Sequence, residues 1–179
     1  VVDVIKKNNE VIHIVDKNGL KVGDKVSCEI NWERRYKLMR MHTACHLISG
    51  IFYKVFNVLI TGNKIDINES RIDFNLEKFD REIIKELIER ANLAIKNDYK
   101  VKVYFMNREE AMKIEGIVKL AKALPPNIET LRIVEIENID IQADGGPHVK
   151  SLKEIGEIEI LKLENKGKSN RRIYFTVKP

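Results

Sequence analysis

The segment from about Trp32 to about Phe56 constrains the fold most, because its apolar residues recur at helical spacing over a broad side. These apolar residues are Leu38, Met41, Cys45, Leu47, Ile48, Ile51, Phe52 and Val55. Asn31, directly before the segment, belongs to a residue type that caps helices. An apolar side this broad needs other elements against it in more than one direction. The sequence therefore predicts a long helix that is packed on two sides.

Residues 1–30 have the alternating pattern of short strands rather than the period of a helix. Alternating runs at 11–15 and 25–30, with turns at Asn18-Gly19 and Gly23-Asp24, predict a small β-meander. The chain lacks an initiator Met and opens inside a strand-like pattern, so we expect it to be processed or truncated.

The rest of the chain alternates strand-like and helix-like segments. Helices are expected to begin at Asp80, with Phe79 in a hydrophobic staple, and at Asn107, with a break at Pro125-Pro126. Strands are expected at 57–60, 64–67, 71–74, 101–105, 131–136, 157–163 and 172–177, with turns at 61–63 and 166–168. This order predicts an α+β fold, with helices packed on a mainly antiparallel sheet, rather than a doubly wound parallel sheet. The expected domain boundary lies near residues 31–36.

The composition, 44% hydrophobic and 33% charged, is that of an ordinary soluble globular protein. No apolar run approaches the roughly 18–20 residues of a spanning helix, so we expect no membrane partner. The two cysteines, Cys28 and Cys45, are too few for a disulfide framework and indicate a reducing, cytoplasmic compartment.

The formal net charge of +5 is concentrated in two places. One basic cluster contains Arg34, Arg35, Lys37 and Arg40. The other contains Lys162, Lys166, Lys168, Arg171 and Arg172. Clustering of this kind favours a nucleic-acid partner over a merely solvated face.

Two of the four histidines, His42 and His46, are four residues apart in the expected long helix. Positions i and i+4 share a helix face, with Cβ atoms about 5–6 Å apart, so both imidazoles can reach one metal ion. Such a pair is also common as a polar edge of a core. A zinc peptidase would need Glu directly after the first histidine. Thr43 occupies that position, so the motif is not that of a zinc peptidase.

A second pair of candidate ligands, Asp144 and His148, flanks Gly145-Gly146-Pro147. Gly and Pro suit a turn that folds the two side chains toward one point, although this tripeptide by itself is more often simply a tight turn. Three histidines and one carboxylate in two compact clusters suit Zn²⁺, which accepts both donor types in tetrahedral geometry.

The motifs His-Thr-Ala-Cys-His-Leu and, about a hundred residues later, Gln-Ala-Asp-Gly-Gly-Pro-His-Val resemble the editing domain of alanyl-tRNA synthetase. They are still more similar to the free-standing alanyl-tRNA editing proteins of the AlaX type. The resemblance covers roughly residues 31–179. Residues 1–30 resemble the tail of the β-domain that precedes editing in longer members. The expected domains are therefore residues 1–32, a remnant of the N-terminal β-domain, and 33–179, a zinc-dependent editing domain.

The resemblance implies hydrolytic removal of the wrong amino acid from tRNA-Ala, chiefly serine with glycine as a second candidate. It implies four ligands to one Zn²⁺ per chain, at His42, His46, position 144 and His148, and these four are the expected catalytic residues. Many members have Cys where this chain has Asp144 and Thr where it has Pro147. Asp144 is therefore either a displaceable ligand, which we favour, or a base that orients a water held by three histidines and zinc.

Selection of serine needs polar groups that bind its hydroxyl, and the candidates are Thr43, Thr61, Gly62 and Asn63. The alternative is that these are ordinary cap or turn residues. The candidates for binding the acceptor end of the tRNA are Arg34, Arg35, Lys166, Lys168, Arg171 and Arg172. Cys45 is expected to be a core residue, and His13 has no expected role.

Three other functions are compatible with the same features. One is a non-catalytic RNA-binding module stabilised by zinc. Another keeps the chemistry but acts on a different mischarged tRNA, such as Ser-tRNA(Thr). The third is a structural domain with histidines in its core.

Overall fold

The computed structural model describes residues 1–8, 10–78, 80–121 and 127–179. The expected staple at Phe79 and the break at Pro125-Pro126 lie outside the described residues. The chain divides into two compact units, Val1–Ile30 and Asn31–Pro179. Of the described helices, none has the length and apolar character needed to cross a membrane.

The first unit is a single hairpin followed by irregular chain. Strand β1 (Asp3–Lys7) pairs antiparallel with β2 (Glu10–Ile14). The strand expected at 25–30 is wrong, because this segment has no strand partner among the described residues and a lone strand leaves its backbone groups unpaired. Every described residue from 1 to 30 is exposed, so this unit has no core of its own.

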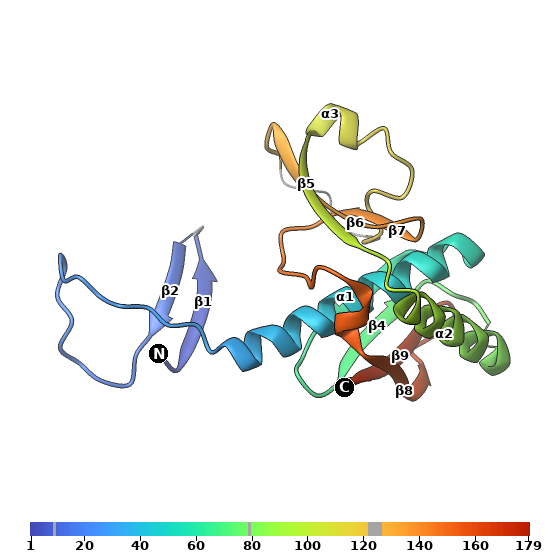
Figure 1. The fold of residues 1–179 in the computed structure, drawn as a ribbon, viewed down its shortest axis with the longest axis horizontal. Coiled ribbons are helices and arrows are strands. Elements are labelled where there is room, and N and C mark those ends of the chain that lie inside the picture. The colour runs from blue at the N-terminus through green and yellow to red at the C-terminus, as the bar shows by residue number, and fades with distance from the viewer. Residues whose placement is uncertain (9, 79, 122–126) are drawn as a thin grey trace. The chain divides into compact units, whose positions relative to one another are not determined.

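The second unit is built on α1 (Trp32–Phe56), which confirms the predicted long helix. Asn31 caps its start by accepting a hydrogen bond from the Arg34 amide at 3.0 Å. The helix ends at Asn57, which adopts the left-handed conformation with φ of 52°. Helix α1 contacts β7 (Asp140–Ala143) on one side and β4 (Ser70–Phe74) and β9 (Arg171–Lys178) on the other (Figure 1). The helix is thus packed on two sides, as its broad apolar surface requires.

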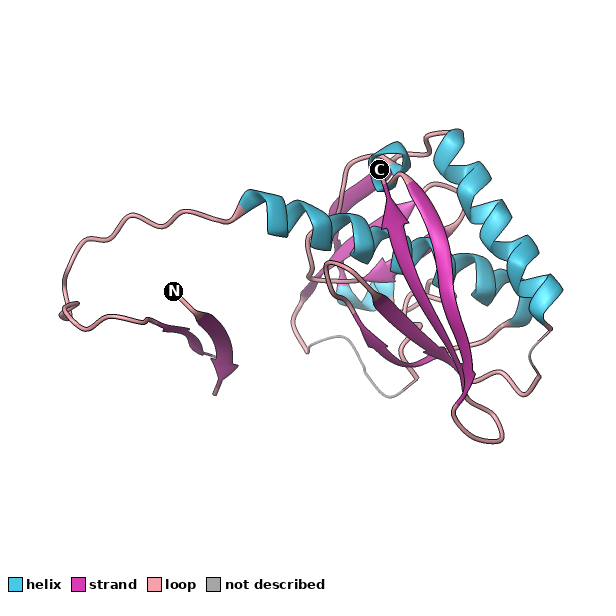
Figure 2. Cartoon of the chain, turned by 90° about the horizontal axis from the view of Figure 1, so that it is seen from below, coloured by secondary structure: helices cyan, strands magenta, loops and turns pink. Residues whose placement is uncertain are grey.

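The strands of this unit form two antiparallel sheets instead of one, within the predicted α+β class (Figure 2). The four-stranded sheet has the order β3-β4-β9-β8, with β3 at Ile60–Lys64 and β8 at Glu157–Asn165. The three-stranded sheet has the order β5-β6-β7, with β5 at Val101–Asn107 and β6 at Thr130–Ile136. The predicted β8–β9 hairpin is confirmed.

Two local predictions from the sequence fail in these sheets. The turn expected at 61–63 is wrong, because these residues lie inside β3, where a register shift between Ile60 and Gly62 accommodates Thr61. The chain reverses after β3 instead, between Lys64 and Ser70. Strand β7 was not predicted at all, because four residues with alternating polar side chains carry little strand signal.

The remaining helices cover these sheets. Helix α2 (Arg81–Lys96) begins where predicted, since the Asp80 side chain accepts from the amides of Glu82 and Ile83. Helix α3 (Arg108–Ala111) is a single turn capped by Asn107, and η1 (Leu152–Ile155) is one 3₁₀ turn. Helices α1 and α2 and the four-stranded sheet supply most of one large core, and a smaller core lies between α3 and β6.

Candidate metal centre

The four residues predicted as metal ligands converge in the structure. His42 and His46 lie on adjacent turns of α1, while Asp144 and His148 lie in the loop after β7. One donor atom from each lies within 4.8 Å of all the others. The Nε2 atoms of His42, His46 and His148 are 3.6, 3.7 and 3.3 Å from the Asp144 carboxylate. Segments about a hundred residues apart in the chain thus form one cluster.

Thr43 fixes the orientation of His148. The Thr43 hydroxyl donates to the carbonyl of Met39 at 2.9 Å, so its lone pairs are left to accept other hydrogen bonds. It accepts one from the Val149 amide at 3.2 Å and one from His148 Nδ1 at 3.1 Å. Nδ1 of His148 is therefore the nitrogen that donates to Thr43, and Nε2, 3.3 Å from Asp144 Oδ1, is the nitrogen that a metal would bind.

The other two histidines have the same tautomer for similar reasons. His46 Nδ1 lies 3.1 Å from Asp140 Oδ2, and a carboxylate oxygen only accepts. His42 Nδ1 lies 3.4 Å from the carbonyl oxygen of Pro147, a longer contact of the same sense. All three Nε2 atoms therefore face the Asp144 carboxylate, and they are the atoms that a metal ion would bind. Support of a ligating imidazole through its other nitrogen is typical of metal sites.

The electrostatics of the cluster favour a bound cation. Burial, followed by the neighbouring His46 and His148, lowers the pKa of His42 to about 3. Burial also opposes the charged form of His46, but the hydrogen bonds to Asp140 and Asp144 outweigh it and raise the pKa of His46 to about 9. Burial raises the pKa of Asp144, but hydrogen bonds from His148 and His46 hold it well below its usual range. A carboxylate anion thus faces three imidazoles, and this donor set fits Zn²⁺.

The loop that carries Asp144 and His148 is fixed by backbone contacts. The Gly146 amide donates to Asp144 Oδ1 at 2.6 Å. Arg132, on β6, donates from Nη1 to the carbonyls of Asp144 at 2.7 Å and Gly146 at 2.9 Å. A Cβ on Gly146 would lie 2.4 Å from His42 Cε1, so glycine is required for the close approach of this loop to α1.

The sequence did not reveal a role for Arg132, Asp140 or Lys119 in supporting this cluster. Asp140 reaches His46 because Gly50 lets β7 approach α1 closely: a Cβ on Gly50 would lie 2.7 Å from Asp140 Cβ. The available signal was a polar residue, Asp140, four positions before Asp144. That signal does not show that the Asp140 side chain contacts His46.

The residues expected to bind the serine hydroxyl are not among the described residues that line the cavity beside His42. Thr43 is fully buried and its hydroxyl already makes three hydrogen bonds, and its contact with substrate stays a prediction. Thr61, in β3, donates to Asn170 at 2.8 Å. An open cavity of about 640 Å³ beside His42 is lined instead by Arg35, Leu38, His42, Ile65, Arg132, Gly145, Gly146 and Pro147. Thr61, Gly62 and Asn63 are not among these described lining residues.

The predicted tRNA-binding residues divide into free and engaged side chains. Arg34 and Lys168 are exposed, and Arg35 lines the cavity. Lys166 is exposed and pairs with Glu164 at 2.8 Å.

The two arginines of the β8–β9 hairpin are engaged in the fold. Arg171 is 7% exposed and donates to the carbonyls of Gly167 and Glu77, among others. Arg172 pairs through two atoms with Asp73, at 2.6 and 2.7 Å. Both guanidinium groups thus have partners within the fold, and a contact of Arg171 or Arg172 with tRNA stays a prediction.

Two minor predictions concern residues outside the cluster. Cys45 belongs to the core, as predicted, and burial raises the pKa of its thiol to about 12. His13 is exposed on β2.

Comparison with known proteins identifies the family of this chain. A family described as the threonyl and alanyl tRNA synthetase second additional domain matches residues 131–174. The chain is 54% identical over 174 residues to the alanyl-tRNA editing protein AlaX-M of Saccharolobus solfataricus, covering 97% of this chain and 73% of that protein. It is 46% identical over 179 residues to AlaX-M of Methanosarcina barkeri, covering 97% and 74%. It is 40% identical over 168 residues to an alanine–tRNA ligase of Methanococcus maripaludis, covering 92% of this chain and 19% of that protein. The chain therefore belongs to the family of alanyl-tRNA editing proteins of the AlaX type.

Proposed function

We propose that this protein hydrolyses the ester bond of mischarged tRNA-Ala, chiefly Ser-tRNA(Ala) and secondarily Gly-tRNA(Ala), at a zinc site. The ligands are His42, His46, Asp144 and His148. The observation that carries the proposal is the convergence of three imidazole Nε2 atoms and one carboxylate beside an open cavity. Family membership supplies the substrate class. Action on aminoacyl-tRNA implies a cytoplasmic location.

Zinc at such a site polarises an ester carbonyl and makes water a stronger nucleophile near neutral pH. Of the four proposed ligands, His42 lines the cavity. The side chains of Asp144 and His42 are 26% and 20% exposed, whereas those of His46 and His148 are 6% and 1% exposed. Asp144 and His42 are therefore the more accessible of the four to a substrate, and His46 and His148 would hold the metal from buried positions. Asp144 acts as a ligand, since it faces all three Nε2 atoms.

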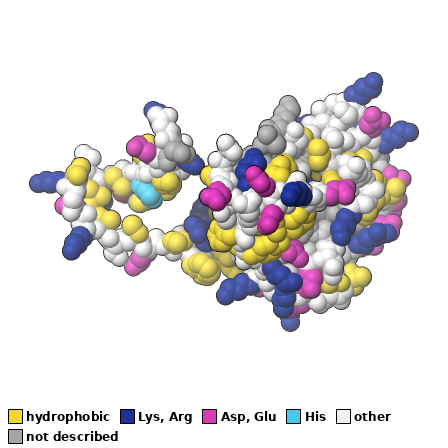
Figure 3. All heavy atoms as spheres, turned by 90° about the horizontal axis from the view of Figure 1, so that it is seen from above, with side chains coloured by type: hydrophobic (Ala, Val, Ile, Leu, Met, Phe, Trp, Pro, Cys, Tyr) yellow, Lys and Arg dark blue, Asp and Glu magenta, His cyan; other side chains and the backbone are white. Residues whose placement is uncertain are grey.

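The cavity suits the terminal nucleotide of a tRNA. Arg35 lines its wall, and a guanidinium group binds phosphate well. Leu38, Ile65 and Pro147 supply apolar surface for a sugar or a base. Farther along the RNA, Arg34, Lys166 and Lys168 are the proposed phosphate contacts. Figure 3 shows Lys and Arg side chains interspersed with Asp and Glu on one face of the molecule.

A zinc-stabilised RNA-binding module without activity is the second candidate, because four protein ligands can fill a tetrahedral metal completely. The two functions differ in whether the ester is cleaved.

The test combines elemental analysis with release of serine from Ser-tRNA(Ala), before and after treatment with a chelator. We expect about one zinc per chain, as a closed ligand set predicts, and hydrolysis that the chelator abolishes and added zinc restores. Asp144→Ala removes a proposed ligand and is expected to lose both zinc and activity. His13→Ala, which changes an exposed histidine on β2, is the matched control and is expected to keep both.

Three other results would each revise the proposal. Zinc without hydrolysis would support the RNA-binding module. Zinc retained in Asp144→Ala, with activity lost, would make Asp144 the base and not a ligand. Faster release from Ser-tRNA(Thr) than from Ser-tRNA(Ala) would change the substrate.

A further inference from the structure

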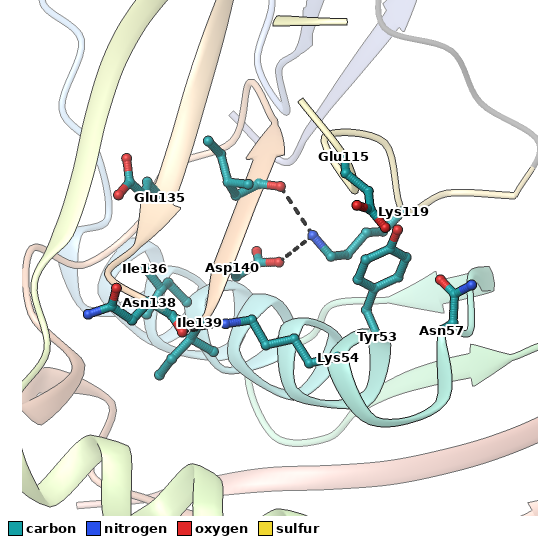
Figure 4. Close-up of a pocket in the computed structure, with 11 residues that line it drawn as sticks. Tyr53, Lys54, Asn57, Glu115, Lys119, Glu135, Ile136, Asn138, Ile139 and Asp140 are labelled. Atoms are coloured by element: carbon teal, nitrogen blue, oxygen red, sulfur yellow. Dashed lines mark hydrogen bonds and ion pairs between the residues drawn. The ribbon is translucent and has the colours of Figure 1, made fainter. Parts of the chain in front are cut away.

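Lys119 is a buried lysine behind the proposed metal centre. Only 3% of the residue is exposed, although it lies at the wall of a cavity of about 600 Å³ (Figure 4). Lysine at such a wall ordinarily extends its ammonium toward water. Here Nζ turns inward and lies 2.7 Å from Asp140 Oδ1, as Figure 4 shows. It also donates to the carbonyls of Gly116 at 2.8 Å and Ile141 at 3.1 Å.

Asp140 connects this lysine to a proposed metal ligand. Its side chain is fully buried, and its two oxygens face different partners. Oδ1 faces Lys119, while Oδ2 accepts from His46 Nδ1 at 3.1 Å and from Gln142 Nε2 at 2.8 Å. Lys119 and His46 are thus joined through a single carboxylate.

We propose that Lys119 and Asp140 are positioning residues of the metal centre, which together hold His46 with Nε2 free to bind the ion. The proposal rests on the metal site of the proposed function but not on its editing activity. Lys119 fixes Oδ1, so that Oδ2 stays directed at His46 Nδ1 as an acceptor. The lysine also balances the charge of Asp140, which leaves Asp144 as the one uncompensated carboxylate of the cluster.

Asparagine at position 140 separates this role from ordinary packing. The amide is close in size to the carboxylate but has one acceptor oxygen instead of two. In Asp140→Asn, Lys119 and His46 compete for that oxygen. If the oxygen faces Lys119, the NH₂ group faces His46 Nδ1 and disfavours the tautomer that leaves Nε2 free.

Replacing the lysine as well removes the competition. In the double variant Lys119→Met with Asp140→Asn, no ammonium is left to attract the amide oxygen. The oxygen can then accept from His46 Nδ1 and Gln142, as Oδ2 does in the unaltered protein. Under this proposal the second substitution therefore restores zinc binding. If Lys119 and Asp140 only stabilise the fold, the second substitution should lower zinc affinity further.

The experiment measures zinc affinity by competition with a coloured chelator, after circular dichroism has shown that each variant is folded. We expect Asp140→Asn to weaken zinc binding by about 10–100-fold, the usual effect of losing a group that supports a ligand. The double variant is expected to recover most of this loss. Lys54→Met is the matched control: Lys54 lines the same cavity but donates to the Asn138 carbonyl, so its loss should leave zinc affinity unchanged.

Two outcomes contradict the proposal while leaving the zinc site intact. Asp140→Asn could bind zinc as tightly as the unaltered protein, or the double variant could bind no better than Asp140→Asn. If the unaltered protein binds no zinc, the metal site itself is wrong.

A measurement on the unaltered protein covers the case in which a variant does not fold. Nitrogen-15 shifts of the His46 ring in the zinc-loaded protein are expected to show a proton on Nδ1 and the metal on Nε2. The reverse assignment would rule out the role of Asp140 and Lys119.

Discussion

Thr43 illustrates how one buried hydroxyl can connect two parts of a site. It lies beside the first proposed ligand in sequence, yet its side chain acts on His148, from the distant loop. Three hydrogen bonds use its donor and its two lone pairs. The part of α1 around Thr43 is thereby joined to the loop that carries Asp144 and His148.

Thr43→Val tests this role by removing the hydroxyl while keeping the shape of the side chain. The Val149 amide then loses a buried acceptor, which costs about 1–3 kcal/mol of unfolding free energy. His148 also loses the group that fixes its tautomer, so zinc affinity is expected to fall by about 10–100-fold. Urea unfolding and chelator competition measure the two effects. Thr43→Ser, which keeps the hydroxyl, should bind zinc like the unaltered protein. Tight zinc binding by Thr43→Val would show that the hydroxyl does not orient His148.

At this scale the sequence predicted the candidate ligands but not their supporting residues. The i, i+4 spacing of His42 and His46 is local, so it could be recognised in the sequence. The contacts of Asp140 with His46 and Lys119 depend on tertiary packing. Polar residues of this kind have no spacing rule, which is why these contacts were not predicted.

Among the elements, α1 was predicted most accurately because its signals are local. The cap at Asn31 and the apolar period of the helix lie within the element itself. Strand β7 depends instead on pairing with β6, and residues 61–63 are extended because β4 pairs with them. A one-residue bulge at Thr61 allows a sequence that looks like a turn to remain in a strand.

The loop after β7 offers a test on two adjacent glycines. Gly146→Ala would place a methyl 2.4 Å from His42 Cε1, so the His42 ring or the loop must move. Gly145→Ala meets nothing within 4 Å and is the matched control. We expect Gly146→Ala to weaken zinc binding by about 10–100-fold and Gly145→Ala to leave it unchanged. Titration against a chelator compares the two variants. Equal zinc affinities of the two variants would mean that the loop accommodates the added methyl group without loss of zinc binding.

In the whole molecule, every residue of the two cores comes from the unit Asn31–Pro179. The described residues from 1 to 30 are all exposed. Stability should therefore reside in the larger unit, because burial of apolar surface is the main favourable contribution to folding.

A chain consisting of residues 31–179 is accordingly expected to fold and to bind zinc. Its urea unfolding midpoint should match that of the full chain, and its zinc affinity should be the same. Both are measured side by side on the two proteins. A large fall in either value would show that residues 1–30 contribute to the larger unit. This comparison concerns folding and zinc binding only. tRNA binding is measured on the full chain.

The two pairs of ligands lie on one helix turn and one loop, separated by about a hundred residues of sequence. An ion held by all four would close those intervening residues into a ring, as a disulfide does in secreted proteins. Closing a long ring restricts the unfolded chain most. An ion bound by all four residues would therefore raise the thermal stability of the fold as well as support hydrolysis. The same ion would then have the stabilising role that a disulfide has in a secreted protein.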